Sequence, residues 1–461
     1  MKRAVNALLL VLAITVTAHA QGDPGDDETY FSQLGIRQAW TEIARRKANG
    51  EQPRQGVIVV ADGPIRCDIP DLVGRCLDQY HKVFTSDGTS FDVNHATTAA
   101  ALMVAVHNNN AGIKGIVPDD SIRLINLEII TSSGIPEASA QAQAYDYTIH
   151  WLVDHEKLNV VAYVTATNAD VPSMTEQYLP QLQARGIMYF PASMSGSQPI
   201  NLDQQQTVFP PNYSPKYPNV IPVAGTIADG VTWDGKSNFG PATVMGAMRA
   251  ENVKTVSLIP PFTGVGSVSN VSISGFQAAG IYALYWAWLE PDPWQARQLL
   301  FDTAEQTPSL QARVKYGRFT AKAFGPPIPC PASSASPVLV PWWNSPTAVA
   351  LDSVTLRSRP FTLSLPQTEN LSASERQTQV AVFLKLASDP SAGSSFTATG
   401  VDSSNVTHQL VVTYVRHVPG TDCLHQVNLR LESGIPTGKL ALRVGVAGIL
   451  TNEASIEIAG P

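Results

Sequence analysis

The chain has 461 residues, of which 44% are hydrophobic and 15% charged, and its formal net charge is -7. This length allows two or three domains, and this composition allows each of them to bury a full hydrophobic core. The sequence has no basic patch that could supply phosphate contacts, so we expect neither nucleic acid nor an anionic membrane surface as a partner.

The N-terminus has the pattern of a secretory signal. Lys2 and Arg3 precede an apolar run that ends in Ala-His-Ala at residues 18–20, a typical cleavage site. A membrane anchor is the alternative, but the run is shorter than the ~20 residues that a span needs. We therefore predict a signal peptide over residues 1–20, no membrane span in the mature chain, and a secreted, periplasmic or cell-surface location.

Four cysteines suit an oxidising compartment, and four cysteines allow three pairings. Nearness in the sequence favours a bond between Cys67 and Cys76, which leaves Cys330 and Cys423 as the second pair. The cysteines do not have the spacing of metal ligands, so we predict no metal site from them.

The first part of the chain alternates between apolar strand-like runs and helical runs, which is typical of a parallel sheet. The expected strands are residues 56–62, 122–130, 159–167, 187–193 and 220–227, and the expected helices are residues 31–47, 95–112, 142–157, 174–186 and 269–284. We therefore predict an α/β domain over residues 30–324, with a three-layer arrangement in which helices cover both faces of a mostly parallel sheet.

The pattern changes after residue 324. Residues 325–345 are rich in Pro and Ser and are predicted to be a linker. Beyond them, short runs with a period of two, separated by turn residues, predict an all-β sandwich domain over residues 346–461. The expected strands there are residues 348–358, 361–366, 379–387, 408–418, 426–433, 440–449 and 454–460.

Three polar residues lie where open parallel sheets collect functional groups, namely at strand ends and helix starts. Asp62 ends the strand at residues 56–62, His95 opens one helix, and Ser272 opens another. Each also has a purely structural explanation, as a turn residue, a surface histidine or a helix N-cap. Their order along the chain, Asp then His then Ser, is one of the known orders of a serine protease triad.

The chemistry of such a triad requires these three residue types. Ser is a poor nucleophile until His removes its proton, and a carboxylate must orient the His. A helix that starts at Ser272 would also point backbone N–H groups and the positive end of its dipole at a developing oxyanion.

The surrounding motifs resemble those of the subtilisin-like serine proteases. "VVADGPIRCDIPDL" resembles the aspartate motif of that family, "NHATTAAALMVAVHNNNAGIKGIVP" resembles its histidine motif, and "NVSISGFQAAGIYAL" resembles its serine motif. The resemblance extends from about residue 34 to residue 304. It implies a subtilisin-like fold in which Asp62, His95 and Ser272 are the catalytic residues.

The resemblance also implies further site residues. Ser195, or alternatively Ser193, stands where the family has an oxyanion-binding Asn, so Ser195 is the implied oxyanion donor. An extended substrate would add as a strand beside Val164, Thr165 and Ala166. No cofactor is required. Calcium sites are common in the family, but no acidic cluster of this sequence specifies one.

We therefore expect a secreted serine endopeptidase that cleaves peptide or protein substrates through an acyl-enzyme. The residues that flank the triad differ from the family motifs: Asn270-Val271 replaces Gly-Thr, and Phe276-Gln277 replaces Pro-His. A catalytically impaired pseudoprotease that acts as a binding or scaffold module is therefore the alternative. A third hypothesis is a cell-surface protein whose function lies in its C-terminal domain, which we expect to attach to a surface or a partner.

Overall fold

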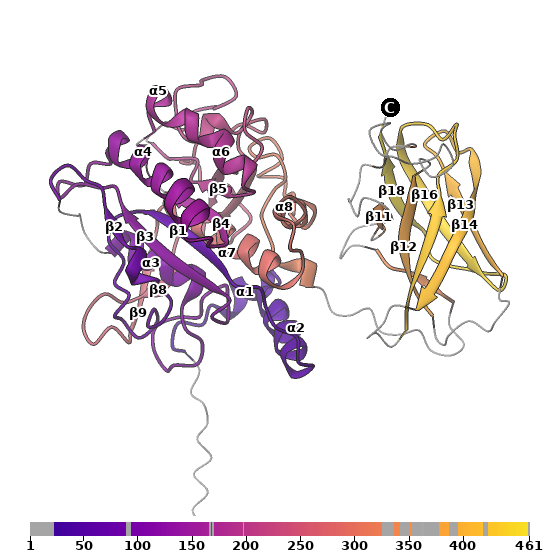
Figure 1. Cartoon of the computed structure of the whole chain (residues 1–461), viewed down its shortest axis with the longest axis horizontal. Coiled ribbons are helices and arrows are strands. Elements are labelled where there is room, and N and C mark those ends of the chain that lie inside the picture. The colour runs from indigo at the N-terminus through magenta and orange to yellow at the C-terminus, as the bar shows by residue number, and fades with distance from the viewer. Residues whose placement is uncertain are drawn as a thin grey trace, which may run out of the picture.

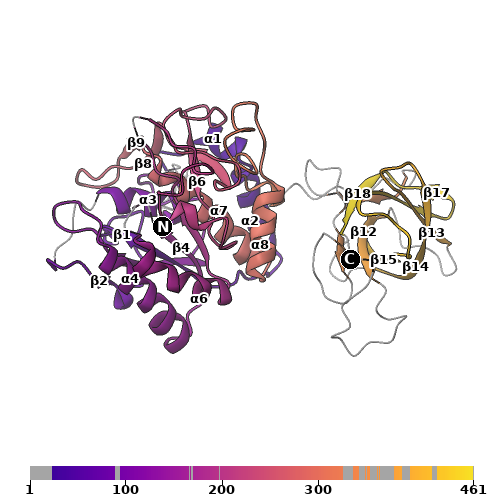
Figure 2. The same cartoon turned by 90° about the horizontal axis from the view of Figure 1, so that it is seen from above.

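We describe the protein from a computed structural model. The structure describes residues 23–88, 94–165, 167, 170–196, 198–324, 336–341, 348, 350–352, 361, 363, 378–386, 395–417 and 423–459. The predicted signal peptide lies outside these residues. Figures 1 and 2 show an N-terminal α/β part and a C-terminal part made of strands.

A five-stranded parallel sheet lies at the centre of the N-terminal part, with the strand order β2-β3-β1-β4-β5. All seven residues of the central strand are buried. Strands that are buried on both faces need apolar side chains throughout, which explains the continuous apolar runs of the sequence. The strands are β1 (Gly56–Asp62), β2 (Lys82–Val83), β3 (Ile122–Glu128), β4 (Val160–Thr165) and β5 (Met188–Pro191).

Alternate residues of β1 enter two different hydrophobic cores, as the two-residue period of a strand requires. Ile58 and Val60 pack in a core with residues of the helices that carry the candidate site, whereas Val57 and Val59 pack in a second core that is rich in tyrosine. Asp62 continues the series of Ile58 and Val60, so it lies on the face of the candidate site.

The helices connect the strands and extend beyond them. They are α1 (Glu28–Gln33), α2 (Ile36–Ala48), α3 (Asn94–Val104), α4 (Ala138–Asp146), α5 (Pro172–Thr175), α6 (Leu179–Ala184), α7 (Ser272–Trp288) and α8 (Pro293–Asp302). A π-helix, η2 (Tyr147–His155), continues α4, and 3-10 turns occupy η1 (Asp78–Tyr80), η3 (Glu176–Tyr178), η4 (Pro211–Tyr213) and η5 (Lys322–Phe324).

Helix α7 runs through the core, and all 17 of its residues are buried. Its small residues permit this close packing. A Cβ at Gly275 would lie 2.8 Å from the carbonyl oxygen of Phe190 at the end of β5, and a Cβ at Gly280 would lie 3.3 Å from Ile116. The start of α7 is therefore pressed against the carboxyl edge of the parallel sheet, which is where β1 ends in Asp62.

Two short strand pairs complete the N-terminal part. The expected strand at residues 220–227 is only partly formed: β6 (Val223–Thr226) pairs in parallel with β7 (Gly246–Arg249) and touches β5 through isolated bridges. An antiparallel hairpin of β8 (Val253–Val256) and β9 (Val265–Val268) precedes α7.

The strands of the C-terminal part form one nine-stranded antiparallel sheet, not the two separate sheets of the predicted sandwich. The reason is the long strand β14, which pairs with β13 from Thr407 to Leu410 and with β15 from Val411 onward, with an irregularity in the second pairing between Val412 and Tyr414. A strand that changes partner in this way bends the sheet around a single core. The strands are β10 (Val338–Leu339), β11 (Ala350–Asp352), β12 (Gln379–Lys385), β13 (Phe396–Val401), β14 (Thr407–His417), β15 (Leu424–Arg430), β16 (Gly438–Val446), β17 (Ile449–Leu450) and β18 (Ala454–Ile458).

The predicted linker at residues 325–345 lies mostly outside the described residues, but it contains one short strand. Val338 and Leu339 form β10 and pair with Lys385 and Leu384 of β12, because this apolar dipeptide completes the buried edge of the C-terminal core. Of the expected strands at residues 348–358 and 361–366, the structure describes β11 and isolated bridges at Ala348 and Phe361. Within the described ranges, no helix combines the length and apolar character that crossing a membrane requires.

Candidate active site

Asp62 is the last residue of β1, and its side chain is fully buried. Its Oδ1 accepts hydrogen bonds from the backbone N–H of Gly63, at 2.7 Å, and from Nδ1 of His95, at 2.9 Å. Its other oxygen, Oδ2, has no hydrogen-bond partner among the described residues. Because an ionised carboxylate only accepts hydrogen bonds, this geometry assigns a proton to Nδ1 of His95.

His95 lies in the first turn of α3, and its side chain is 28% exposed. Its Nε2 lies 2.7 Å from Oγ of Ser272. With the proton on Nδ1, Nε2 of a neutral imidazole accepts the hydrogen bond from the serine hydroxyl. The ring of Phe276 packs edge-on against the imidazole, at 6.5 Å between ring centroids, and so restricts its tilt.

Ser272 is the first residue of α7 and is only 5% exposed. Its backbone N–H donates a hydrogen bond to Oδ1 of Asn270, at 3.1 Å. Val271 already has helical dihedrals, with φ -62° and ψ -25°. The side chain that caps this helix therefore belongs to Asn270 and not to Ser272, which leaves the Ser272 hydroxyl for His95.

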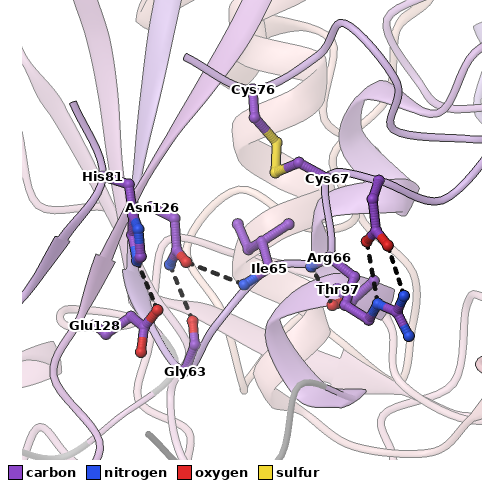
Figure 3. Close-up of a disulfide and its surroundings, with 10 residues drawn as sticks. Gly63, Ile65, Arg66, Cys67, Cys76, His81, Thr97, Asn126 and Glu128 are labelled. Carbon is purple, nitrogen blue, oxygen red and sulfur yellow. Dashed lines mark hydrogen bonds and ion pairs between the residues drawn. A yellow bond between two sulfur atoms is a disulfide. The ribbon is translucent and has the colours of Figure 1, made fainter. Parts of the chain in front are cut away.

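The loop that follows Asp62 is fastened to its surroundings by side chains (Figure 3). The carboxamide of Asn126, on β3, donates to the carbonyl of Gly63 and accepts from the backbone N–H of Ile65, at 2.9 and 3.0 Å. The N–H of Arg66 donates to Oγ1 of Thr97, which lies on α3 two residues after His95. The loop thus ties the strand of the candidate carboxylate to the helix of the candidate base.

A disulfide between Cys67 and Cys76 closes this loop, as the sequence predicted (Figure 3). Cys76 forms a bridge with Leu124 of β3, so the disulfide anchors the far end of the loop to the sheet. Cys423 is also disulfide-bonded. Its expected partner, Cys330, lies outside the described residues.

A second histidine–carboxylate pair lies beside Asp62. Glu128 is the neighbour of Asp62 in the register of β1 and β3, and it is 3% exposed. Its Oε1 lies 2.6 Å from Nε2 of His81 (Figure 3). This hydrogen bond raises the pKa of His81 above its usual value, against the opposing effect of burial. This pair was not predicted from the sequence, although a Glu at the end of an apolar strand could have indicated it.

The structure does not place Ser195 in contact with Ser272. Ser195 is exposed, its backbone bridges to Ser237, and its side chain lines a cavity of about 280 Å³ together with Asn270 and Val271. The alternative residue, Ser193, is buried, and its hydroxyl makes only a long contact of 3.4 Å with the carbonyl of Met194. Ser195 therefore lies near the start of α7, but no described hydrogen bond directs it there.

The prediction of a substrate strand beside residues 164–166 is wrong for its first two residues. Val164 pairs with both Val60 and Phe190, and Thr165 pairs with both Ala61 and Pro191. A strand that is paired on both edges offers no free backbone groups to an added peptide. Ala166 lies outside the described residues.

Among the described residues, one group could bring three metal-binding side chains together, namely Cys67, Cys76 and Asp78. Both sulfur atoms of this group are bonded to each other, so they are not thiolate ligands. The expectation that no cofactor is required stays a prediction.

Comparisons with known proteins give no family for the chain. No family model matches it, and no curated protein matches it. Among solved structures, a subunit described under "Structural basis of subtilase cytotoxin SubAB assembly" has 17% identity and a TM-score of 0.49, over 63% of this chain and 93% of that chain. The A subunit of the AB5 toxin from E. coli has 18% identity and a TM-score of 0.48, over 64% of this chain and 96% of that chain.

These findings overturn the predicted membership of the subtilisin-like serine protease family. These two solved structures are of toxin subunits, and no family model of any kind matches the chain. The motifs around the three candidate residues differ from the family pattern at the positions that flank each of them, so the matching positions were too few to define a family. Both likenesses are too low in identity and TM-score to carry an activity or a partner over to this chain.

Proposed function

We propose that this chain is a serine endopeptidase, and the observation that carries the proposal is one continuous hydrogen-bonded chain. Asp62 Oδ1 lies 2.9 Å from His95 Nδ1, and His95 Nε2 lies 2.7 Å from Ser272 Oγ. Both distances lie within the range expected of a nucleophile, a base and the group that orients the base. A helix cap, a turn residue and a surface histidine would not need to be hydrogen-bonded to one another. The structural explanations of Ser272, Asp62 and His95 therefore do not account for this geometry.

The proposed reaction follows from which atom holds which proton. Oγ of Ser272 attacks the peptide carbonyl while Nε2 of His95 takes the hydroxyl proton, and the electron pair of the C=O bond moves onto oxygen. His95 then returns the proton to the leaving amine, which gives an acyl-enzyme that water hydrolyses by the same steps. Asp62 keeps the Nδ1 proton in place and stabilises the imidazolium that forms.

The carboxylate is the most deeply buried of the three residues and the base is the most exposed, which supports this assignment. Asp62 is fully buried, Ser272 is 5% exposed and the His95 side chain is 28% exposed. A buried carboxylate interacts strongly with a forming imidazolium because water screens it little. A cavity of about 280 Å³ is lined by Asn270 and Val271, the two residues that directly precede Ser272 in the chain.

A binding module without catalysis is the second candidate, and two observations favour it. The N–H of Ser272 is occupied by Asn270, and Oδ2 of Asp62 has no described partner. An enzyme would need that N–H for the oxyanion, and catalytic carboxylates are usually held by more than one donor. In this alternative, the site binds a peptide without cleaving it.

We also propose that the protein acts outside the cytoplasm, after export by the predicted signal peptide. The disulfide of Cys67 with Cys76, together with the bonded state of Cys423, supports an oxidising compartment. The C-terminal sheet would then attach the enzyme to a surface or a partner.

We further propose that the sheet of the enzyme lies between two helical layers. The two cores on either side of β1 support this arrangement. One core contains Ile281 and Leu284 of α7, and the other contains Ala140 of α4 and Leu182 of α6.

Labelling with a fluorophosphonate probe tests the proposed activity. We expect the purified mature chain to be labelled, and Ser272→Ala to abolish the labelling. Ser267→Ala is the matched control, because Ser267 is exposed on β9 and its loss should change nothing. If the wild type is not labelled while circular dichroism shows it folded, the binding module is the better description.

A further inference from the structure

The hydrogen bond at the start of α7 occupies the donor that a serine hydrolase needs most. The N–H of Ser272 is one of the N-terminal donors of α7 that have no partner inside the helix. When Oγ of the same residue attacks a carbonyl, the negative charge develops on an oxygen within reach of this N–H. In the described state, Oδ1 of Asn270 lies on that donor at 3.1 Å.

An acceptor at this place opposes catalysis as long as it stays. The carbonyl oxygen of the substrate and Oδ1 of Asn270 compete for the same N–H. Two partly negative oxygens next to each other also repel, and the repulsion grows as the substrate oxygen becomes an oxyanion. The transition state therefore requires Asn270 to release the N–H of Ser272.

The other end of the same carboxamide is a donor. Because the N–H of Ser272 fixes which atom is Oδ1, the opposite atom is Nδ2, with two N–H groups. The structure records no hydrogen bond from this Nδ2 to any described residue. Asn270 is exposed and lines the cavity of about 280 Å³ that it shares with Ser195. The amide can therefore turn without losing any other described hydrogen bond.

We propose that Asn270 is the oxyanion-binding residue of this enzyme and that it acts by turning its carboxamide when substrate binds. The turn exchanges Oδ1 for Nδ2, frees the N–H of Ser272, and places two donors around the substrate oxygen. This inference rests on the proposed function. It assigns to Asn270 the role that the sequence comparison assigned to Ser195, whose hydroxyl no described hydrogen bond directs toward the nucleophile.

Two substitutions of Asn270 distinguish its proposed role as an oxyanion donor from its role as a helix cap. Asn270→Asp keeps an acceptor for the N–H of Ser272, and therefore the helix cap, but has no N–H to donate. Asn270→Ala removes both the acceptor and the donor and leaves the N–H of Ser272 free. Asn252→Asp makes the same chemical change at an exposed residue that does not line the cavity, and serves as the matched control.

The readout is the second-order rate of labelling by the fluorophosphonate, with the thermal unfolding of each variant measured beside it. We expect both Asn270 variants to react about 10²–10³-fold more slowly than the wild type, as the loss of one oxyanion donor predicts. Asn270→Asp should unfold at the temperature of the wild type, and Asn252→Asp should react at its rate. The protein should come from a host without N-glycosylation, because Asn270-Val271-Ser272 is an N-x-S sequence.

The outcomes distinguish the two proposals. If Asn270→Asp reacts as fast as the wild type, or Asn270→Ala reacts faster, Asn270 is only a cap that blocks the site, and the inference is overturned while the enzyme remains. If a folded wild type does not react at all, the proposed function fails and this inference fails with it.

Discussion

The two ends of the hydrogen-bonded chain are held in different ways. On the carboxylate side, the side chain of Asn126 donates one hydrogen bond to the loop after Asp62 and accepts another from it. Thr97, on the helix of His95, and the disulfide at Cys67 also fix this loop. Each of these contacts joins the loop to an element of the core. The orientation of the base is therefore determined by the fold before any substrate arrives.

On the nucleophile side, α7 itself is packed in the core, but the segment that precedes it has exposed residues. Ser269 and Asn270 are exposed, and the carboxamide of Asn270 is the side chain that fixes the N–H of Ser272. The difference suggests a division of labour between a rigid base and an adjustable oxyanion site. Hydrogen-bond donors stabilise an oxyanion most when they already point at its position before the reaction. The oxyanion site at Asn270 is not arranged in this way, so activity can be lost or regulated there.

The largest effect should come from the rigid side. Asp62→Asn removes the negative charge that stabilises the imidazolium. If the amide oxygen takes the place of Oδ1, it still accepts from Gly63 and His95; if the amide turns, both hydrogen bonds are lost and its N–H forces the wrong tautomer on the imidazole. We expect the labelling rate of Ser272 to fall about 10⁴-fold. Asp68→Asn is the control in the same loop, since Asp68 is exposed and, among the described residues, forms an ion pair only with Arg66. A rate within tenfold of the wild type would show that Asp62 does not orient the base.

A substitution of Asn126 should have the next largest effect on the labelling rate. The effect should be smaller than that of Asp62→Asn because Asn126 contacts neither the nucleophile nor the base and acts only through the loop that positions Asp62. Asn126→Ala removes both hydrogen bonds to the loop and lets Asp62 move. Displacements of about 1 Å at catalytic groups cost on the order of 10²-fold in rate. We therefore expect a 10- to 100-fold slower reaction, measured at a temperature where the variant is folded.

Asn126→Asp refines this prediction. It still accepts the N–H of Ile65, but it turns a carboxylate oxygen toward the carbonyl oxygen of Gly63 in place of the donor. The two oxygens repel, so its rate should be no higher than that of Asn126→Ala. If Asn126→Ala reacts like the wild type, the bracing of the loop is not what positions Asp62.

The sequence predicted the rigid side better than the adjustable side, and the reason is physical. Strands that are buried on both faces must be apolar, so β1 and β3 were recognisable, and a parallel sheet brings the end of β1 and the starts of α3 and α7 to one edge. These rules sufficed to bring Asp62, His95 and Ser272 together. Asn126 was hidden because a polar residue inside an apolar strand shows its purpose only through its partners.

The remaining failures concern features that depend on partners distant in the sequence. Ser272 and Asn270 are equally good N-cap residues, and only the dihedrals of Val271 decide between them. A period of two predicts strands, but it does not say that β14 pairs with two neighbours in succession. The substrate strand failed for the same reason, since the sequence does not show that both edges of β4 are occupied.

The disulfide should contribute mainly to stability. It closes a short loop, with a sequence separation of nine, and a cross-link over such a loop stabilises by about 2–3 kcal/mol in the chain-entropy account. We expect the double variant Cys67→Ser, Cys76→Ser to lower the free energy of unfolding by this amount in a denaturant titration. Because Asn126 and Thr97 still hold the first half of the loop, its labelling rate should fall less than that of Asn126→Ala. A larger fall would mean that the disulfide, and not Asn126, sets the position of Asp62.

The smallest effect should be a pH dependence of the free energy of unfolding, caused by the pair of His81 and Glu128 beside Asp62. The hydrogen bond to Glu128 raises the pKa of His81 above the 6.5 of an unfolded chain, so the folded state binds this proton more tightly. The resulting stabilisation is fully present below pH 6.5 and is lost as the pH rises through the pKa of the folded state. His81 is 42% exposed, so solvent screening limits the contribution to under about 1 kcal/mol.

The variant His81→Gln tests this assignment. It can still hydrogen-bond Glu128 but cannot become charged, so its free energy of unfolding should match that of the wild type above the pKa of His81 and fall below it at pH 6. The charged neighbours Asp78 and Lys82 act on His81 in opposite directions and are unchanged in the variant. Equal stabilities at pH 6 would contradict the assignment. A loss at pH 6 with an unchanged labelling rate would show that the pair supports the fold beside Asp62 without taking part in the reaction, which is the behaviour expected of the rigid side.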